Sequence, residues 1–381
     1  MNLYKLSNDI DIKKYLKELH VDIGGINILT SKAQCQIFYI THMHVGAANI
    51  LKQDALSIGA DLAVPRGVVT AHEPYVDALL IANERHLKIL AKKELTQPFG
   101  LKDVAAQLKQ FINIQKPKQT QLMGIINAND DSFFEASRFK DAKAVGKVYE
   151  MIEDGASIID IGGVSSRPGS LAVDADEELE RIKPIVDILY KKSLYEQVKL
   201  SIDSYEPKVI SYVLERGFSI VNDITGLQND SVCRLCAAYD ATAVIMHMQK
   251  NPHVMQQSPY YENIILDIDN FFTAQIQKAK QFGIKDIILD VGIGFGKTLQ
   301  HNTALINNLT HFLHFNKPLL IGASRKSMIG DITKTDVSDR LPGTLALHLR
   351  AANHGASILR VHDVYEHYQA LQVDEYLKNA N

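Results

Sequence analysis

The 381-residue chain lacks several features that would assign it to a special class of protein. Its three cysteines are too few for a disulfide framework and favour a reducing compartment. No stretch approaches the ~18 uncharged apolar residues of a membrane-spanning helix. The first residues, MNLYKLSNDIDIKKYLKEL, carry charges where a secretion signal has an apolar segment. We therefore expect a cytoplasmic protein that does not enter a membrane.

The chain also lacks an excess of charge of either sign. The chain has 41 basic and 44 acidic residues, a net charge of −3, and no long basic run. This balance argues against a general affinity for nucleic acid or for an anionic membrane. Hydrophobic residues make up 46% and charged residues 22%, which is ordinary for a globular protein. The length allows two domains, or one large α/β barrel with an extension.

Short apolar runs alternate with helical stretches from about residue 119 onward. The runs are rich in Ile, Val and Leu, as expected of strands that are buried on both faces. Helical stretches such as PKVISYVLERG separate them. Eight strands in this alternation predict a (β/α)₈ TIM barrel, whereas a doubly wound sheet would have a glycine-rich turn after its first strand. The eight runs span residues 121–127, 157–163, 198–204, 219–224, 243–248, 287–294, 318–324 and 357–363.

Almost every run ends in polar or glycine residues. In barrels of this kind the carboxyl ends of the strands form the active-site face. A single Asp at a strand end is often only a helix cap, but eight polar strand ends in register predict a shared site. These strand ends are Asn127, Asp160 to Gly163, Asp203, Asn222 and Asp223, His247, Asp290, Ser324 to Lys326, and Arg360 with His362.

The stretch DVGIGFGKT, residues 290–298, looks like a phosphate-binding loop but matches no such template. A P-loop has four residues between its first glycine and the Gly-Lys pair, and Gly292 and Gly296 enclose three. A dinucleotide fingerprint has the order G-x-G-x-x-G, and here the order is G-x-G-x-G. The glycines therefore need a different explanation.

Nine ordered motifs make the chain from about residue 119 to 375 resemble dihydropteroate synthase. That family joins 6-hydroxymethyl-7,8-dihydropterin diphosphate to p-aminobenzoate and releases pyrophosphate. The motifs are MGIINANDDSF (123–133), DIGGVSSRPG (160–169), SIDSY (201–205), VNDITGL (221–227), IMHMQKNPHVMQ (245–256), DVGIGFGKT (290–298), IGASRKSMIG (321–330), RLPGTLA (340–346) and ILRVHDV (358–364).

The resemblance implies roles for several of the strand-end residues. The chemical steps are expected to depend on Lys326, Asp203, Arg360 and His362. On the same resemblance Mg²⁺ is the cofactor and Asn127 is its ligand. The pterin is expected to contact Asp203, Asn222, Met246, Asp290, Phe295 and Lys326. The diphosphate is expected to contact Ser166, Arg167, Arg360 and His362, and p-aminobenzoate Phe133, Pro168 and Ser327. Asp290 then binds the pterin, the glycines after it allow a close approach, and Lys297 needs no role in phosphate binding.

Two loops depart from the family pattern. The first usually has the sequence N-V-T-P-D-S-F-S-D-G-G, and residues 127–137 have the sequence NANDDSFFEAS. In the second, a Glu is replaced by Val164. Because glycine gives a closing loop its range of φ angles, we expect the activity to be kept with altered affinity for p-aminobenzoate or sulfonamides.

Residues 1–118 lie outside the resemblance and predict a small mixed α/β domain of unknown role, followed by the catalytic barrel at 119–381. His42 and His44 form an H-x-H pair without a third ligand nearby, which favours ordinary surface or core histidines over metal binding. Cys233 and Cys236 lie in a helical stretch, and we expect them to pack in a core. The resemblance implies small-molecule substrates. Because many barrels of this family are dimeric, we also expect a homodimer.

Two other interpretations remain open from the sequence. A corrinoid-linked methyltransferase would have a similar pterin pocket, but the SRKS and RVHD motifs indicate a diphosphate site that it does not need. A non-catalytic pterin-binding paralogue would explain the altered loops, and would bind pterin without turnover.

Overall fold

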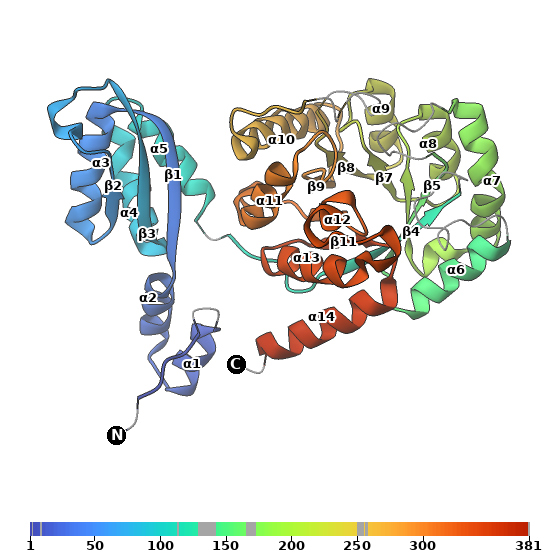
Figure 1. The fold of residues 1–381 in the computed structure, drawn as a ribbon, viewed down its shortest axis with the longest axis horizontal. Helices are drawn as coiled ribbons and strands as arrows, with labels where there is room; N and C mark the ends of the chain where they lie inside the picture. Colours follow the sequence, from blue (N-terminus) through green and yellow to red (C-terminus); the bar gives the residue numbers. More distant parts are fainter. Residues whose placement is uncertain are drawn as a thin grey trace. The chain divides into compact units, whose positions relative to one another are not determined.

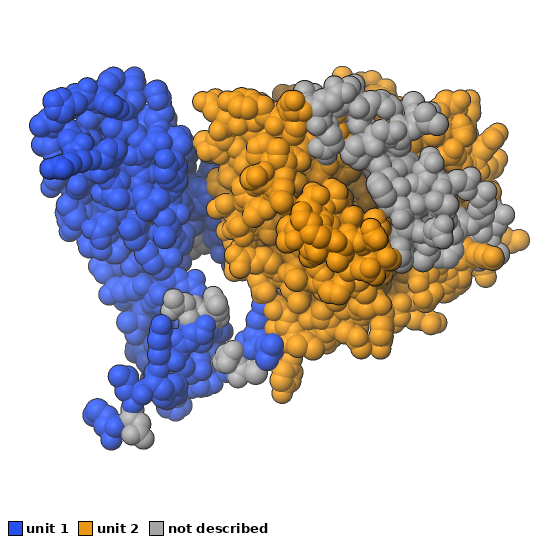
Figure 2. All heavy atoms as spheres, in the orientation of Figure 1, with its two compact units in different colours: residues 1–115, 377–381 blue, residues 116–376 orange. Residues whose placement is uncertain are grey.

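The structure is a computed structural model that describes residues 1, 3–7, 10–112, 114–128, 142–164, 173–249, 255 and 258–379. It divides into two compact units, coloured separately in Figure 2. Unit 1 comprises Met1–Gln115 together with Leu377–Asn381, and unit 2 comprises Lys116–Tyr376. The division thus falls after Gln115, where the sequence suggests a boundary after residue 118. No helix in the described ranges has the length and apolar character needed to cross a membrane.

Unit 1 is the expected small α/β domain. A three-stranded antiparallel sheet in the order β1-β3-β2 packs against its helices, with Leu51, Leu80, Leu87 and Leu90 fully buried between them. The elements are α1 (Ile12–Glu18), α2 (Ile23–Ala33), β1 (Cys35–His44), α3 (Val45–Ile58), β2 (Asp61–Ala63), η1 (Val68–Thr70), β3 (Tyr75–Asn83), α4 (Glu84–Lys93), η2 (Glu94–Thr96) and α5 (Leu101–Gln110).

Unit 2 is a closed barrel of eight parallel strands, which confirms the predicted (β/α)₈ TIM barrel (Figure 1). Each strand falls on one of the eight apolar runs. The strands are β4 (Gln121–Asn127), β5 (Ile158–Gly162), β6 (Lys199–Asp203), β7 (Ile220–Asp223), β8 (Thr242–Met246), β9 (Ile287–Asp290), β10 (Leu319–Ile321) and β11 (Ile358–Val361). The barrel closes where β11 pairs with β4.

Helices connect the strands and cover the barrel from outside (Figure 1). Their starts follow local rules: Asp174 caps α7 by accepting from two backbone N–H groups, and Pro207 occupies the first turn of α8. The helices are α6 (Ala142–Glu153), α7 (Ala175–Lys191), η4 (Leu194–Glu196), α8 (Pro207–Leu214), α9 (Asp230–Ala238), α10 (Ile264–Gln281), α11 (Leu299–Asn307), η5 (Leu309–Phe315), α12 (Ser327–Thr333), η6 (Val337–Arg340), α13 (Leu341–Asn353) and α14 (Val364–Asn379).

The barrel interior is filled by side chains and forms no channel. Seven strands each contribute one buried residue to a single apolar cluster: Met123, Ile158, Ile220, Val244, Ile288, Leu320 and Ile358. These residues precede the polar strand ends, so the apolar cluster forms a floor below them. Because all eight strands are parallel, their carboxyl ends meet at one rim, and the polar strand ends collect there.

Candidate active site

The centre of the rim is a hydrogen-bonded group of two carboxylates and one guanidinium. Arg360, at the end of β11, donates from Nε to Asp160 Oδ2 at 2.6 Å and from Nη2 to Asp203 Oδ2 at 2.5 Å. Asp160 has no exposed surface and also accepts from Ser201 Oγ at 2.5 Å and from Asn222 Nδ2 at 3.1 Å. One buried carboxylate of β5 thus fixes side chains from β6, β7 and β11.

Burial and the neighbouring charges shift the pKa values of two members of this group, Asp203 and Arg360. Burial raises the pKa of Asp203 to about 6; Arg360 opposes the rise and the nearby Asp160 adds to it. Burial lowers the pKa of Arg360, but Asp160 and Asp203 outweigh it and raise that pKa overall. One guanidinium is therefore shared by two acids, and Asp203 is more easily protonated than an ordinary aspartate.

The glycine-rich loop after β9 is a tight turn held by the protein's own groups. Asp290 Oδ1 accepts from Gly292 N at 2.8 Å, and His247 N donates to Asp290 O at 2.9 Å. Gly292 has φ of 68°, and a Cβ there would lie 2.0 Å from the carbonyl oxygen of His247. The glycine is required at this position by both its backbone conformation and the approach of the β8 backbone.

Lys297 does not face a phosphate site. Its buried Nζ donates to His247 O at 3.1 Å and to Phe295 O at 3.0 Å, and lies 3.0 Å from His247 Nδ1. Burial lowers the pKa of Lys297 to about 7, with Asp290 opposing that change. Burial and Lys297 together lower the pKa of His247 to about 2, so the imidazole is neutral and accepts from the lysine. Lys297 therefore braces the loop from inside.

Lys326 is the lysine that faces the rim. Its Nζ donates to Ile293 O at 2.5 Å and lies 4.5 Å from the centroid of the Phe295 ring. Burial lowers the pKa of Lys326 to about 8, which Asp290 counteracts and Arg360 reinforces. Burial raises the pKa of Asp290, and Lys326 counteracts that rise. Lys326 and Asp290 thus form a donor and an acceptor beside one aromatic face.

Three adjacent polar residues after β10, Ser324, Arg325 and Lys326, contact three different parts of the protein. Ser324 Oγ lies 2.9 Å from His362 Nδ1, which orients the imidazole at the end of β11. Arg325 has φ of 53° and its guanidinium forms a bidentate ion pair with Asp363 at 2.8 and 2.9 Å, so it is structural. Lys326 alone of the three reaches Ile293 O and the Phe295 ring.

The other predicted site residues are placed as follows. Met246 is buried at the end of β8, Asn127 is half-buried at the end of β4, and Ser327 is exposed at the first position of α12. Asn222 is buried and donates from Nδ2 to Asp160 Oδ2. Phe133, Ser166, Arg167 and Pro168 lie outside the described residues, as do the altered positions of loop 127–137 beyond Ala128.

Sequence reasoning gave no role to two buried acids of the rim. Asp160 organises the central group, and its signal was a charged residue between Ile159 and Ile161 inside an apolar run, which requires buried partners. Asp223 accepts from the backbone N–H groups of Thr225 and Leu227 and shapes the turn after β7. Both position the site rather than face it.

Comparison with known proteins agrees with this geometry. Residues 123–362 match the family described as pterin binding enzyme. A bifunctional dihydropteroate synthase/dihydropteroate reductase of Helicobacter pylori is 43% identical over 379 residues, covering 100% of both chains. The dihydropteroate synthase of Escherichia coli is 41% identical over 257 residues, 67% of this chain and 90% of its own. The crystal structure of the Yersinia pestis dihydropteroate synthase in a sulfonamide drug complex superposes with a TM-score of 0.65 at 38% identity, covering 68% of this chain and 95% of that one.

The chain therefore belongs to the pterin-binding enzymes, a family of TIM barrels with their site at the carboxyl ends of the strands. Its reaction is that of the dihydropteroate synthases. It condenses 6-hydroxymethyl-7,8-dihydropterin diphosphate with p-aminobenzoate to 7,8-dihydropteroate in folate biosynthesis and releases pyrophosphate. This outcome favours the first of the three interpretations of the sequence.

Proposed function

We propose that the edge of the pterin ring is bound by Asp203, Asn222, Asp290 and Lys326. A pterin edge presents N–H donors beside carbonyl and ring-nitrogen acceptors. The two carboxylates and the amide oxygen accept, and the lysine donates. The observation that carries the proposal is that the Lys326 ammonium is within electrostatic reach of both acids while it lies over the Phe295 ring. An acceptor pair, a donor and an aromatic face are thus combined in one buried place.

The two faces of the ring would contact Met246 and Phe295. Met246 is 3% exposed at the end of β8, and Phe295 is held in place by the turn that Lys297 braces. A thioether and an aromatic ring are polarizable partners for a flat heterocycle.

The diphosphate would be bound by Arg360 and His362. Asp160 and Asp203 engage two N–H groups of the guanidinium, and its further N–H donors can reach phosphate oxygens. His362 is oriented by Ser324. Phosphate sites in TIM barrels commonly gather near the last two strands, where these residues lie. Ser166 and Arg167 would complete the anion site from the loop after β5.

Mg²⁺ would be held by Asn127 together with diphosphate oxygens and water. The carboxamide oxygen at the end of β4 suits this ion, because Mg²⁺ prefers oxygen donors and takes few from protein when it binds a phosphorylated substrate. β4 pairs with β11, so Asn127 lies on the strand next to Arg360 and His362. When bound, the ion would neutralise charge on the leaving diphosphate.

The chemistry then needs little acid or base catalysis. The bond from the pterin methylene carbon to the diphosphate oxygen breaks, and its electron pair leaves with the diphosphate. Arg360 and His362 stabilise the charge on the leaving oxygens. Asp203 and Asp290 balance the positive charge that remains on the pterin. The amine nitrogen of p-aminobenzoate bonds to the methylene carbon and releases a proton to solvent.

Steady-state kinetics of the full-length protein test this division of roles. In Asp290→Asn we expect the KM for the pterin diphosphate to rise at least about tenfold with the KM for p-aminobenzoate unchanged, because one good charged hydrogen bond is lost. Arg360→Lys should instead lower kcat. The surface variant Asp240→Asn is the matched control. A wild-type pterin KM in Asp290→Asn would refute the assignment.

The amine side is proposed to involve Ser327, Phe133 and Pro168, with an affinity changed by the rewritten loop 127–137. Ser327 is exposed beside Lys326, which places a hydroxyl at the outer edge of the pterin residues. The test compares the wild-type loop with the triple variant Asp130→Pro, Ala136→Gly and Ser137→Gly. Indistinguishable amine KM and sulfonamide Ki values would count against an altered amine site.

We propose that the protein is a homodimer, on two grounds. Resemblance to a family with many dimeric barrels is the first, and the last helix exposes Tyr365, Tyr368 and Val373, which is more apolar surface than a helix facing water usually carries. We also propose a cytoplasmic location, because the three cysteines are unpaired, as in a reducing compartment. Light scattering of the purified protein would give the mass, and a monomer at all concentrations would contradict the dimer.

A second activity, reduction of dihydropteroate, is favoured by the extent of the similarity. The synthase of E. coli matches 67% of this chain, while the bifunctional synthase/reductase of H. pylori matches 100% of it. Unit 1 is therefore shared with the protein whose name includes a reductase. We propose that this chain also reduces dihydropteroate to tetrahydropteroate, with hydride delivered to the ring carbon of the N5=C6 bond and a proton to N5.

The reductase proposal requires an external hydride donor of the reduced nicotinamide or reduced flavin class. The test is oxidation of either donor by the full-length protein, dependent on dihydropteroate, with tetrahydropteroate identified by mass. Normal dihydropteroate synthesis without any reduction would refute the second activity and leave the first untouched.

A further inference from the structure

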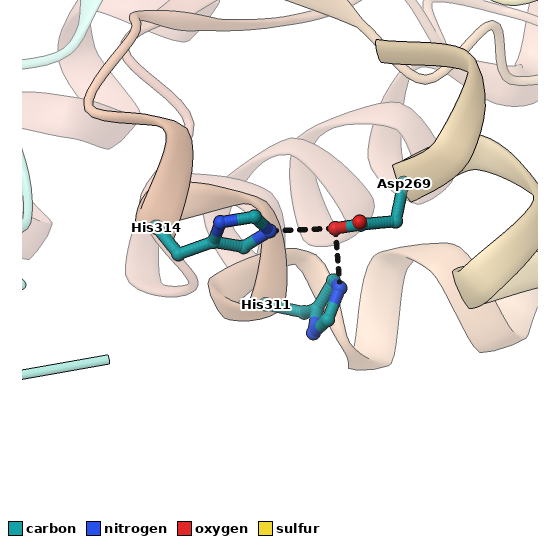
Figure 3. Close-up of side chains that lie close together, drawn as sticks. All are labelled: Asp269, His311 and His314. Carbon is teal, nitrogen blue, oxygen red and sulfur yellow. Dashed lines mark hydrogen bonds and ion pairs between the residues drawn. The ribbon is translucent and has the colours of Figure 1, made fainter. Parts of the chain in front are cut away.

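A second group of polar side chains lies outside the pterin site. Asp269 comes from α10, and His311 and His314 come from η5 (Figure 3). Asp269 Oδ1 lies 3.0 Å from His311 Nε2 and 2.6 Å from His314 Nε2. One atom of each side chain lies within 4.8 Å of the other two. Figure 3 shows both imidazole rings directed at the same carboxylate oxygen.

Local backbone geometry explains why the two histidines face the same way. A 3₁₀-helix has three residues per turn, so side chains at i and i+3 lie directly above one another. The imidazole centroids of His311 and His314 are 5.1 Å apart. Phe272 of α10 packs edge-on against Phe312 and Phe315 at 5.7 and 5.9 Å, which fixes η5 against the helix that carries the acid.

The acid is ionised at neutral pH. Burial raises the pKa of Asp269, but hydrogen bonds from His311 and His314 outweigh it and lower that pKa to about 2. The side chains of Asp269 and His311 are 22% and 23% exposed, so water and small ions can reach them, and His314 is nearly buried at 6%. An anion and two imidazoles thus meet at a partly open edge of the barrel.

We propose that Asp269, His311 and His314 bind a divalent transition-metal ion, with Zn²⁺ the best match. Two imidazole nitrogens and one carboxylate oxygen form a donor set that Zn²⁺ uses with water in the fourth position, whereas Mg²⁺ and Ca²⁺ prefer oxygen alone. Bonds of about 2.0–2.1 Å place tetrahedral ligands about 3.3 Å apart, so side-chain shifts of under about 1 Å would convert the hydrogen-bonded group into a coordination site. The ion would replace the shared protons and crosslink α10 to η5.

The site would be separate from the pterin pocket. Phe271, two residues after Asp269, packs against His247 of the active-site rim at 4.9 Å. Two residues on an α-helix are about 200° apart, so Asp269 lies on the opposite face of α10. The metal would therefore act on stability and not on the condensation itself.

The H-x-H pair of unit 1 provides a contrast. The His42 ring stacks on Tyr75 at 4.2 Å and the His44 ring stacks on Phe99 at 4.6 Å. No cluster with three ligand atoms includes them among the described residues. The two rings stack on aromatic neighbours, which makes His42→Gln a matched control.

The test is titration of metal-free full-length protein with Co²⁺, followed by visible absorption and displacement with Zn²⁺. Excess Mg²⁺ would occupy oxygen-only sites. We expect one Co²⁺ per chain with tetrahedral bands, and a loss of affinity of at least about tenfold in His311→Gln, His314→Gln and Asp269→Asn, since even an outer-shell change costs that much. His42→Gln should bind as the wild type does. Zn²⁺ should raise the melting temperature of the wild type and not of the three variants.

Two results would overturn the proposal. One is the absence of saturable Co²⁺ binding. The other is binding that persists in all three variants. If the variants melt earlier than the wild type with no dependence on metal, the group is a hydrogen-bonded structural element only. Dihydropteroate synthesis at the wild-type rate in each variant would establish that the variants are folded.

Discussion

Asp160→Asn is the substitution that most directly tests the central group of the rim. The amide has the shape of the carboxylate, so its oxygen can still accept from Arg360 Nε while its NH₂ faces Ser201 Oγ, which sits on the other carboxylate oxygen. What changes is the charge. Among the described residues, Arg360 would keep Asp203 as its one carboxylate partner, at 2.5 Å.

The magnitude follows from the contacts. A hydrogen bond to a charged group contributes about 1.5–3 kcal/mol, and full loss of a buried partner costs about 3–5 kcal/mol. Because Asp203 remains, we expect unfolding to become easier by about 2 kcal/mol. For a unit of this size that corresponds to a fall in melting temperature of about 4–8 °C. We expect kcat to fall about 10- to 100-fold, since the guanidinium loses the group that orients it.

The pH profile gives a readout that a merely structural role would not move. Asp160 contributes to raising the pKa of Asp203 to about 6, after burial and against Arg360. Removing the Asp160 charge should therefore lower the pKa of Asp203. We expect the acid limb of kcat/KM to report ionisation of Asp203 in the free enzyme, so that limb should shift to lower pH.

Ser201→Ala is the matched control for this prediction. It removes one neutral hydrogen bond to Asp160 and keeps the charge, so stability should fall by about 1 kcal/mol with an unmoved acid limb. The reasoning fails if Asp160→Asn leaves the acid limb in place, or if its stability equals that of Ser201→Ala.

Three further predictions concern the loop after β9 and a buried acid of α7. In Gly292→Ala the new Cβ would lie 2.0 Å from His247 O at a φ of 68°, so we expect a loss of at least about 1–2 kcal/mol in thermal denaturation and a higher KM for the pterin diphosphate; wild-type values for both would contradict the clash. Lys297→Met removes an internal brace and should cost about 1–3 kcal/mol with the diphosphate Kd unchanged, whereas calorimetry showing weaker diphosphate binding would restore a phosphate role. Burial raises the pKa of Glu178 from 4.5 to about 7, so the native state holds a proton that the unfolded state has lost between these two values, and the wild type should lose up to about 3 kcal/mol of stability as pH rises from about 4.5 to about 7; Glu178→Gln should remove that slope in urea denaturation, and a slope equal to the wild type's would contradict it.

The barrel was predictable because its strands are buried on both faces. A continuous apolar run is the pattern that such strands produce, and the run at 121–127 coincides with β4 residue for residue. Helix α2 was not predicted. It begins IGGIN, and two glycines disfavour a helix by local propensity; in the structure Asp22 caps the helix by accepting from Gly24 N, and Ile26 is its buried residue.

The identity of the site residues followed from strand-end positions, but their partners did not. Asp160 and Arg360 are separated by 200 positions, and no local pattern records that β11 closes the barrel near β5. Ser324, Arg325 and Lys326 are neighbours in sequence, yet a φ of 53° at Arg325 directs its side chain to Asp363 and leaves Lys326 for the rim. Sequence spacing cannot distinguish these outcomes, because they depend on the backbone conformation of one residue.

The turn at Gly292 also bears on drug resistance. A side chain at this position collides with the backbone of β8, and backbone cannot be changed by substitution. A resistance mutation there would carry its own penalty in folding, while loop 127–137 already differs from the family pattern at several positions. On the pterin assignment proposed above, an inhibitor that contacts the pterin residues would meet positions with few viable replacements. On the proposed amine assignment, an inhibitor that depends on loop 127–137 would meet a segment whose sequence already departs from the family pattern.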